Sequence, residues 1–97
     1  MKEIEILKKA AEMELDAITT YSKWSEELGE SDTAYLLDHI IPDEIEHFDE
    51  IMRELHKLSD PRAREYFKEI CKKVEGKPFA PDVCKLITAE RYRYLLR

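Results

Sequence analysis

The chain has few of the residues that build tight turns, metal-binding thiol motifs and membrane spans. Only two glycines and four prolines occur among its 97 residues. Few glycines with abundant Glu, Lys, Leu and Ile predict an all-α fold. The two cysteines form no Cys-x-x-Cys motif, which excludes a rubredoxin-like iron site. No apolar run approaches 18 residues, so we expect no transmembrane span.

Basic residues are also scarce. There are 16 of them against 22 acidic residues, a net charge of −6, which argues against a nucleic-acid partner. Residues 1–60 are strongly acidic and residues 61–97 are basic. This asymmetry indicates either a solvated acidic face beside a basic tail or an acidic half that attracts cations. Residues 1–10 do not resemble a secretory signal, so the expected compartment is the cytoplasm, with no membrane partner.

Turn signals divide the chain into four predicted helices, at about 2–28, 32–58, 61–75 and 82–96. Gly29 ends the first, Asp60-Pro61 starts the third, and a Gly/Pro-rich loop lies at 76–82. Pro42 predicts a kink in the second helix or, alternatively, the start of a separate one. We expect one domain, with a helical hairpin at 1–60 and a C-terminal extension at 61–97. Its core is thin, which favours a partner chain.

Both hairpin helices carry an apolar stripe that charged residues interrupt. The stripes are Ile4, Leu7, Ala11, Glu14, Ile18, Tyr21, Ser25 and Leu28 in the first helix, and Leu37, Ile40, Glu44, His47, Ile51, Glu54 and Leu58 in the second. Beside the second stripe lie Ile41, Ile45, Phe48 and Leu55. Burying a charge costs several kcal/mol unless it is paired or bound to a metal. The interruptions at Glu14, Glu44 and His47 therefore predict a functional site.

These three residues should meet at the middle of the hairpin. Glu14 lies 16 residues before the turn and Glu44 lies 14 after it, so they differ by about 3 Å in level. Two carboxylates and an imidazole suit iron or manganese, with zinc also possible. Two copies related by a twofold axis would complete a four-helix bundle and a di-iron ligand set. Alternatively, His47 is an ordinary buried histidine paired with Glu14 or Glu44. His39 and His56 fall off the stripe, where we expect surface residues.

Two motifs carry a family resemblance. Residues 14–21 (ELDAITTY) and 43–47 (DEIEH) resemble the metal motifs of rubrerythrin- and ferritin-like proteins. Because the motifs are not repeated, the chain is similar to the half-sized, encapsulated-ferritin type. The resemblance implies a homodimer with a di-iron ferroxidase centre at its interface, possible assembly into a larger ring, and Glu14, Glu44 and His47 as iron ligands. Tyr21 and Trp24 would lie near the iron or serve in packing.

The resemblance implies oxidation of Fe(II) to Fe(III) by oxygen or peroxide, with Glu14, Glu44 and His47 as the catalytic residues, in iron storage or detoxification. The alternatives are a rubrerythrin-like di-iron peroxide reductase and a metal-free helical dimerisation module. Encapsulated members sit inside a protein shell, so a nanocompartment and an encapsulating shell partner are further expectations. Residues 91–97 (RYRYLLR) read as amphipathic helix, unlike the short targeting peptide of such members.

The remaining candidate residues lie outside the stripes. Cys71 and Cys84 are equally far from the centre of their loop, so a disulfide is possible, but in a cytoplasmic protein we expect two reduced, buried thiols. Glu90 is either an accessory acid or a surface ion-pair partner. An acidic group flanks the site and forms either a cation entry path or a solvated face: Glu12, Asp16, Glu46, Asp49 and Glu50.

Overall fold

The computed structural model describes residues 2–85, which contain three long helices and no strand. Helix α1 spans Glu3–Leu28, α2 spans Asp32–Lys57 and α3 spans Pro61–Lys73. Residues 82–85 are helical as well. The all-α prediction is confirmed for this part of the chain, and the first three predicted helices end within two residues of the observed bounds. Most of the predicted helix at 82–96 lies outside the described residues.

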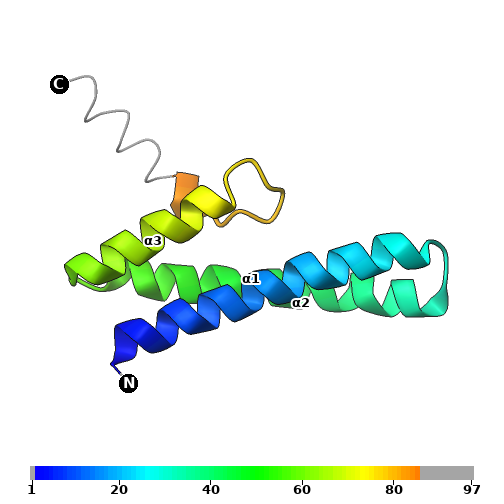
Figure 1. The fold of residues 1–97 in the computed structure, drawn as a ribbon, viewed down its shortest axis with the longest axis horizontal. Coiled ribbons are helices and arrows are strands. Elements are labelled where there is room, and N and C mark those ends of the chain that lie inside the picture. The colour runs from blue at the N-terminus through cyan, green and yellow to red at the C-terminus, as the bar shows by residue number, and fades with distance from the viewer. Residues whose placement is uncertain (1, 86–97) are drawn as a thin grey trace.

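Helices α1 and α2 form an antiparallel hairpin, with α3 lying against the half that holds the start of α1 and the end of α2 (Figure 1). Gly29 ends α1 with a φ of +61°, a conformation that glycine adopts without a steric penalty. Ser31 then caps α2, its Oγ accepting a hydrogen bond from the Ala34 N–H at 3.1 Å. These local signals place the turn where the sequence predicts it.

Helix α2 continues through Pro42 as one helix, so the alternative of a separate helix starting there is wrong. The apolar period runs on across the proline, and burial of that face outweighs the loss of one backbone hydrogen bond. Helix α3 starts at Pro61, and the Asp60 carboxylate accepts a hydrogen bond from the Arg62 N–H at 2.8 Å.

One hydrophobic core joins the three helices. Its fully buried side chains of largest volume include Phe48 and Met52 from α2, Phe67 from α3 and Ile18 from α1. Val83 and other residues after α3 pack into the same cluster. No helix within residues 2–85 has the length and apolar character needed to cross a bilayer.

The predicted stripe of α2 lies at the edge of its buried face and not at the centre. The buried residues of α2 are Ala34, Phe48, Met52 and Leu55, whereas Glu54 and His47 of the predicted stripe are exposed. Two apolar stripes run side by side on this helix, and packing against both α1 and α3 selects the one that carries Phe48. The other stripe remains only partly covered.

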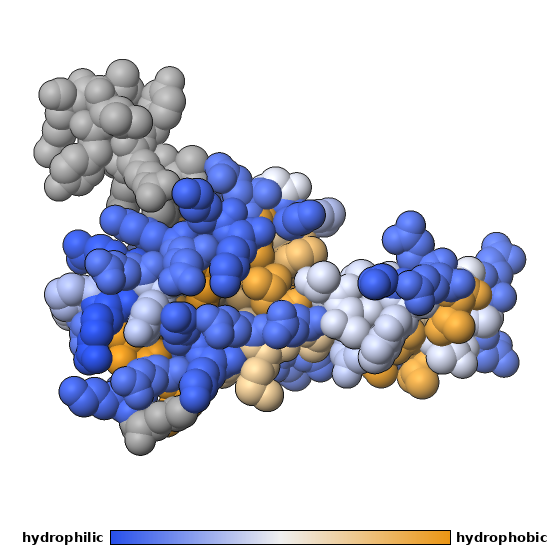
Figure 2. All heavy atoms as spheres, in the orientation of Figure 1, coloured by the Kyte–Doolittle hydropathy of each residue, from blue (hydrophilic) through white to orange (hydrophobic). Residues whose placement is uncertain are grey.

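Apolar side chains are therefore left in contact with solvent along the hairpin. Ile6, Met13, Trp24 and Leu28 recur at helical spacing on α1, and Met13 is 71% exposed. On α2 the exposed Leu36 shares a face with the partly buried Ile40 and Ile51 and with the exposed His47. Figure 2 shows hydrophobic side chains interrupting a largely hydrophilic surface, some of them at the turn end of the hairpin. We call this surface the open stripe; its residues are Ile6, Met13, Trp24 and Leu28 on α1 and Leu36, Ile40, His47 and Ile51 on α2.

Candidate metal centre

Glu14, Glu44 and His47 converge in the folded chain. Each offers one ligand atom, and the three atoms lie within 4.8 Å of one another. Glu14 comes from α1, and the other two come from successive turns of α2, where a spacing of three residues keeps both on one face. Helical period and hairpin register are sufficient to bring the three predicted residues together.

Burial differs among the three side chains. Glu14 and Glu44 are partly buried, whereas His47 is exposed. His47 is thus not an ordinary core histidine of the single chain, whereas its prediction as a ligand on a seam that a second copy covers stays a prediction. The cause of its exposure is the choice of stripe on α2, which turns Phe48 inward and leaves His47 at the edge of the hairpin.

One carboxylate oxygen of this group has no partner. Glu14 Oε2 is buried and forms no hydrogen bond with any described residue. Buried polar atoms are almost always hydrogen-bonded, and an unpaired one costs free energy. A cation bound between the three side chains would give this oxygen the partner it lacks, so the residues fit a metal ion.

The electrostatics of Glu14 lead to the same conclusion. Its pKa is raised, first by a hydrogen bond with the Glu44 carboxyl, then by burial and by the negative charge of Glu44, while His47 lowers it. Two carboxyls this close tend to share a proton when no cation separates them. A metal ion bound here would displace that proton and let both groups ionise.

The donor set is chemically selective but incomplete. Two carboxylate oxygens and one imidazole nitrogen suit iron, manganese or zinc rather than a soft, thiol-preferring metal. These metals take four to six ligands, so one chain leaves coordination positions free. His47 is exposed, so this edge of the group is in contact with solvent.

The other polar candidates lie apart from this group. His39 and His56 are exposed, as predicted, and the His56 ring lies 4.9 Å from that of Phe67. Among the flanking acids, Glu12 pairs with Lys8 at 3.8 Å and Asp49 pairs with Arg53 at 2.7 Å. These two pairs match an ordinary solvated face better than a cation path.

The aromatic candidates pack against each other. The rings of Tyr21 and Trp24 lie 6.1 Å apart at an angle of 48°. Tyr21 is partly buried, and Trp24 is 49% exposed on the open stripe. Glu90, the proposed accessory acid, lies outside the described residues.

The expectation of reduced thiols at Cys71 and Cys84 is wrong in this structure, where the two residues form a disulfide with their Cα atoms 5.2 Å apart. The signal available in the sequence was their symmetric placement about the loop, which the expected compartment outweighed. The spacing of the two cysteines was therefore a better guide than the expected compartment.

The chain matches no protein family model, no curated protein and no solved structure in comparisons with each. The candidate centre is therefore defined by its own geometry: three ligand atoms within 4.8 Å and a buried oxygen without a partner.

Proposed function

We propose that this chain carries half of a two-iron ferroxidase centre, which a second copy completes across a twofold axis. The observation that carries the proposal is the buried, unpartnered Oε2 of Glu14 within a cluster of three ligand atoms. The resemblance of residues 14–21 and 43–47 to ferritin-like motifs selects iron among the metals that this donor set accepts.

Charge supports two metal ions in the dimer. Two copies bring four carboxylates and two imidazoles, and the four negative charges balance two Fe(II) ions. Carboxylate oxygens are hard ligands that favour Fe(III) over Fe(II), so this donor set lowers the free energy of the oxidised product. The reaction that the donor set favours is therefore oxidation of bound Fe(II).

The reaction balances with an external oxidant. Two Fe(II) ions each give one electron, and this electron pair with two protons converts one O2 to H2O2. With peroxide as the oxidant, the same two electrons and two protons give two waters. Glu14 and Glu44 hold the substrate iron, and the exposed edge beside His47 admits the oxidant.

The open stripe supports dimerisation. It places apolar side chains on both hairpin helices beside the candidate centre, where a second hairpin would cover them. The same contact would bury His47, which is exposed in the single chain. One association would then complete both the ligand set and the core.

Anaerobic titration with Fe(II), followed by exposure to O2, tests this function. We expect one Fe(II) per chain, followed by formation of Fe(III) with one O2 consumed per two irons. Glu14→Ala and His47→Ala should lose both, whereas the control His39→Ala, which changes an exposed histidine outside the site, should retain them.

Other results would overturn the proposal. Equal iron binding by Glu14→Ala and the wild type would show that the assignment of the iron site to these residues is wrong. Dimerisation without binding of iron, manganese or zinc would favour the metal-free dimerisation module. Turnover of peroxide with an added reductant, without oxidation of Fe(II) by O2, would favour the peroxide reductase.

A further inference from the structure

The Cys71–Cys84 disulfide closes a loop at the C-terminal end of α3. Cys71 lies in the last turn of α3 and Cys84 in the helical residues 82–85, and the two are 13 residues apart in sequence. The two residues are 8% and 6% exposed. A large protein surface has little access to sulfur atoms at this depth.

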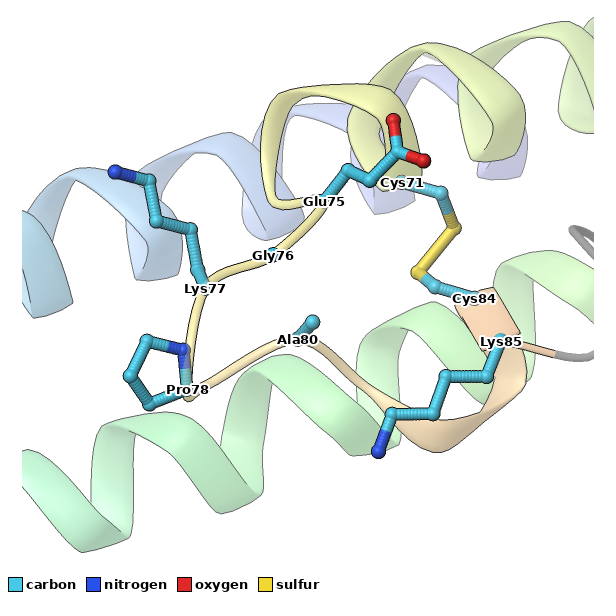
Figure 3. Close-up of a pocket in the computed structure, with 8 residues that line it drawn as sticks. All are labelled: Cys71, Glu75, Gly76, Lys77, Pro78, Ala80, Cys84 and Lys85. Atoms are coloured by element: carbon cyan, nitrogen blue, oxygen red, sulfur yellow. A yellow bond between two sulfur atoms is a disulfide. The ribbon is translucent and has the colours of Figure 1, made fainter.

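A pocket of about 310 Å³ gives access to the disulfide from one side. Figure 3 shows the S–S bond spanning the two arms of the loop at the edge of this pocket. Both cysteines belong to the lining, which is completed by Glu75, Gly76, Lys77, Pro78, Ala80 and Lys85. The volume suits an amino acid or a short peptide rather than a protein segment.

The charge around the pocket is opposite in sign to that of the chain. Residues 71–85 carry four lysines and two acidic residues, whereas the whole chain has a net charge of −6. The lining itself holds two lysines, Lys77 and Lys85, and one carboxylate, Glu75, and Lys85 pairs with Asp82 at 3.4 Å. A positive field attracts anions and stabilises the thiolate forms that take part in exchange.

We propose that Cys71–Cys84 is an exchangeable disulfide, reduced by a small thiol that carries carboxylates and enters this pocket. The attacking thiolate forms a mixed disulfide with one cysteine, and the S–S bond breaks to release the other as a thiolate. A second molecule attacks the mixed disulfide and frees the first cysteine. In total, two small thiols are oxidised to one disulfide, and the protein disulfide becomes two thiols after proton uptake.

Reduction removes the covalent link between α3 and residues 82–85. Val83 and Cys84 belong to the hydrophobic core, so this segment is held by packing as well as by the bond. Exchange would thus convert a covalent attachment into one that opens reversibly. This device is independent of the metal centre, whose residues lie on α1 and α2.

Reduction kinetics of the oxidised full-length chain test the proposal. The probes are 3-mercaptopropionate, 2-mercaptoethanol and cysteamine, which carry a carboxylate, a hydroxyl and an ammonium group beside the reacting thiolate. Freed thiols are trapped by alkylation and counted by mass spectrometry. Each thiol is compared with itself across variants, so differences in thiol pKa cancel. The variants are Lys77→Glu in the pocket and Lys23→Glu as the control on α1.

The attacking thiolates of 3-mercaptopropionate, 2-mercaptoethanol and cysteamine carry net charges of −2, −1 and 0. We therefore expect Lys77→Glu to slow 3-mercaptopropionate most, about three- to fivefold at low ionic strength, 2-mercaptoethanol less, and cysteamine least. Lys23→Glu should change none of the three rates. Equal effects of Lys77→Glu on all three thiols would overturn the proposal. A reduction rate that is the same for every thiol and every thiol concentration would also overturn it. Such a rate would show that the disulfide becomes accessible only after the chain unfolds. Reduction by a protein dithiol but by none of the small thiols would also contradict it.

Discussion

At the scale of single residues, Glu14 is the group on which the proposed metal centre depends most. Its raised pKa and its buried oxygen without a partner both reflect a carboxyl held beside Glu44 with no cation between them. A buried oxygen without a partner destabilises the folded chain, and in the proposed centre a bound metal ion would supply that partner. Stability and function should therefore oppose each other at this position.

Glu14→Gln should stabilise the metal-free protein at pH 7 by on the order of 1 kcal/mol, or about 4–8 °C in Tm. The amide removes the repulsion from Glu44 and supplies a donor. The control Glu12→Gln removes a carboxylate that pairs with Lys8, so it should not stabilise. Thermal unfolding with and without metal checks this: added iron should raise the Tm of the wild type but not of Glu14→Gln. A metal-free Glu14→Gln protein that is less stable than the wild type would contradict the claim that Glu14 destabilises the metal-free chain.

The pH dependence has a defined sign. The pKa of Glu14 is raised above 4.5 in the folded chain, so the protonated form is favoured by folding. That contribution to stability is full below pH 4.5 and is lost as the pH rises through the raised pKa. The metal-free wild type should thus lose stability relative to Glu14→Gln over this interval, as measured by urea unfolding at several pH values. A constant difference between the two proteins across the interval would argue against the shift.

Metal affinity should depend on His47 and not on His39. Both are exposed, but only His47 lies within ligand distance of the carboxylates. Loss of a direct ligand should weaken binding by more than the roughly 10- to 100-fold typical of outer-shell changes. Calorimetric titration with Mn(II), which avoids oxidation, measures this, and equal affinities for His47→Ala and His39→Ala would contradict the assignment.

At the scale of elements, the helices follow from local signals and their packing does not. Gly29, Ser31 and Asp60-Pro61 act within a few residues, so the helix bounds could be predicted closely. The buried face of α2 could not, because two apolar stripes are adjacent and α3, a distant element, determines which one is covered. The exposure of His47 depends on the same long-range choice.

The disulfide joins elements and should stabilise them. Closing a loop of this length contributes about 3 kcal/mol by restricting the unfolded chain. The double variant Cys71→Ser with Cys84→Ser should therefore unfold about 10–20 °C lower than the oxidised wild type. The reduced wild type is the matched control and should unfold near the double variant. Equal Tm values for oxidised and reduced wild type would show that the bond constrains little.

At the scale of the whole molecule, the open stripe and the incomplete ligand set lie side by side on the hairpin. Figure 1 shows α3 covering only one half of the hairpin, and exposed apolar residues such as Met13 and Trp24 remain on α1. The sequence predicts a dimer from the family resemblance and from the spacing of the apolar stripes. The structure of one chain adds which apolar residues remain available for it.

Met13→Glu should prevent dimerisation without unfolding the chain, since Met13 is 71% exposed. Tyr35→Glu is the matched control because Tyr35 is 62% exposed on α2 but lies off the open stripe. Sedimentation velocity should give a dimer for the wild type and for Tyr35→Glu, and a monomer for Met13→Glu. A dimer for all three would place the interface elsewhere.

Diffraction at the iron absorption edge, from crystals grown with Fe(II), tests the shared metal centre most directly. We predict two anomalous peaks related by a twofold axis, each bound by Glu14, Glu44 and His47 side chains of two chains that face each other. Iron absent from these residues, or a single chain whose three side chains enclose no metal, would contradict it.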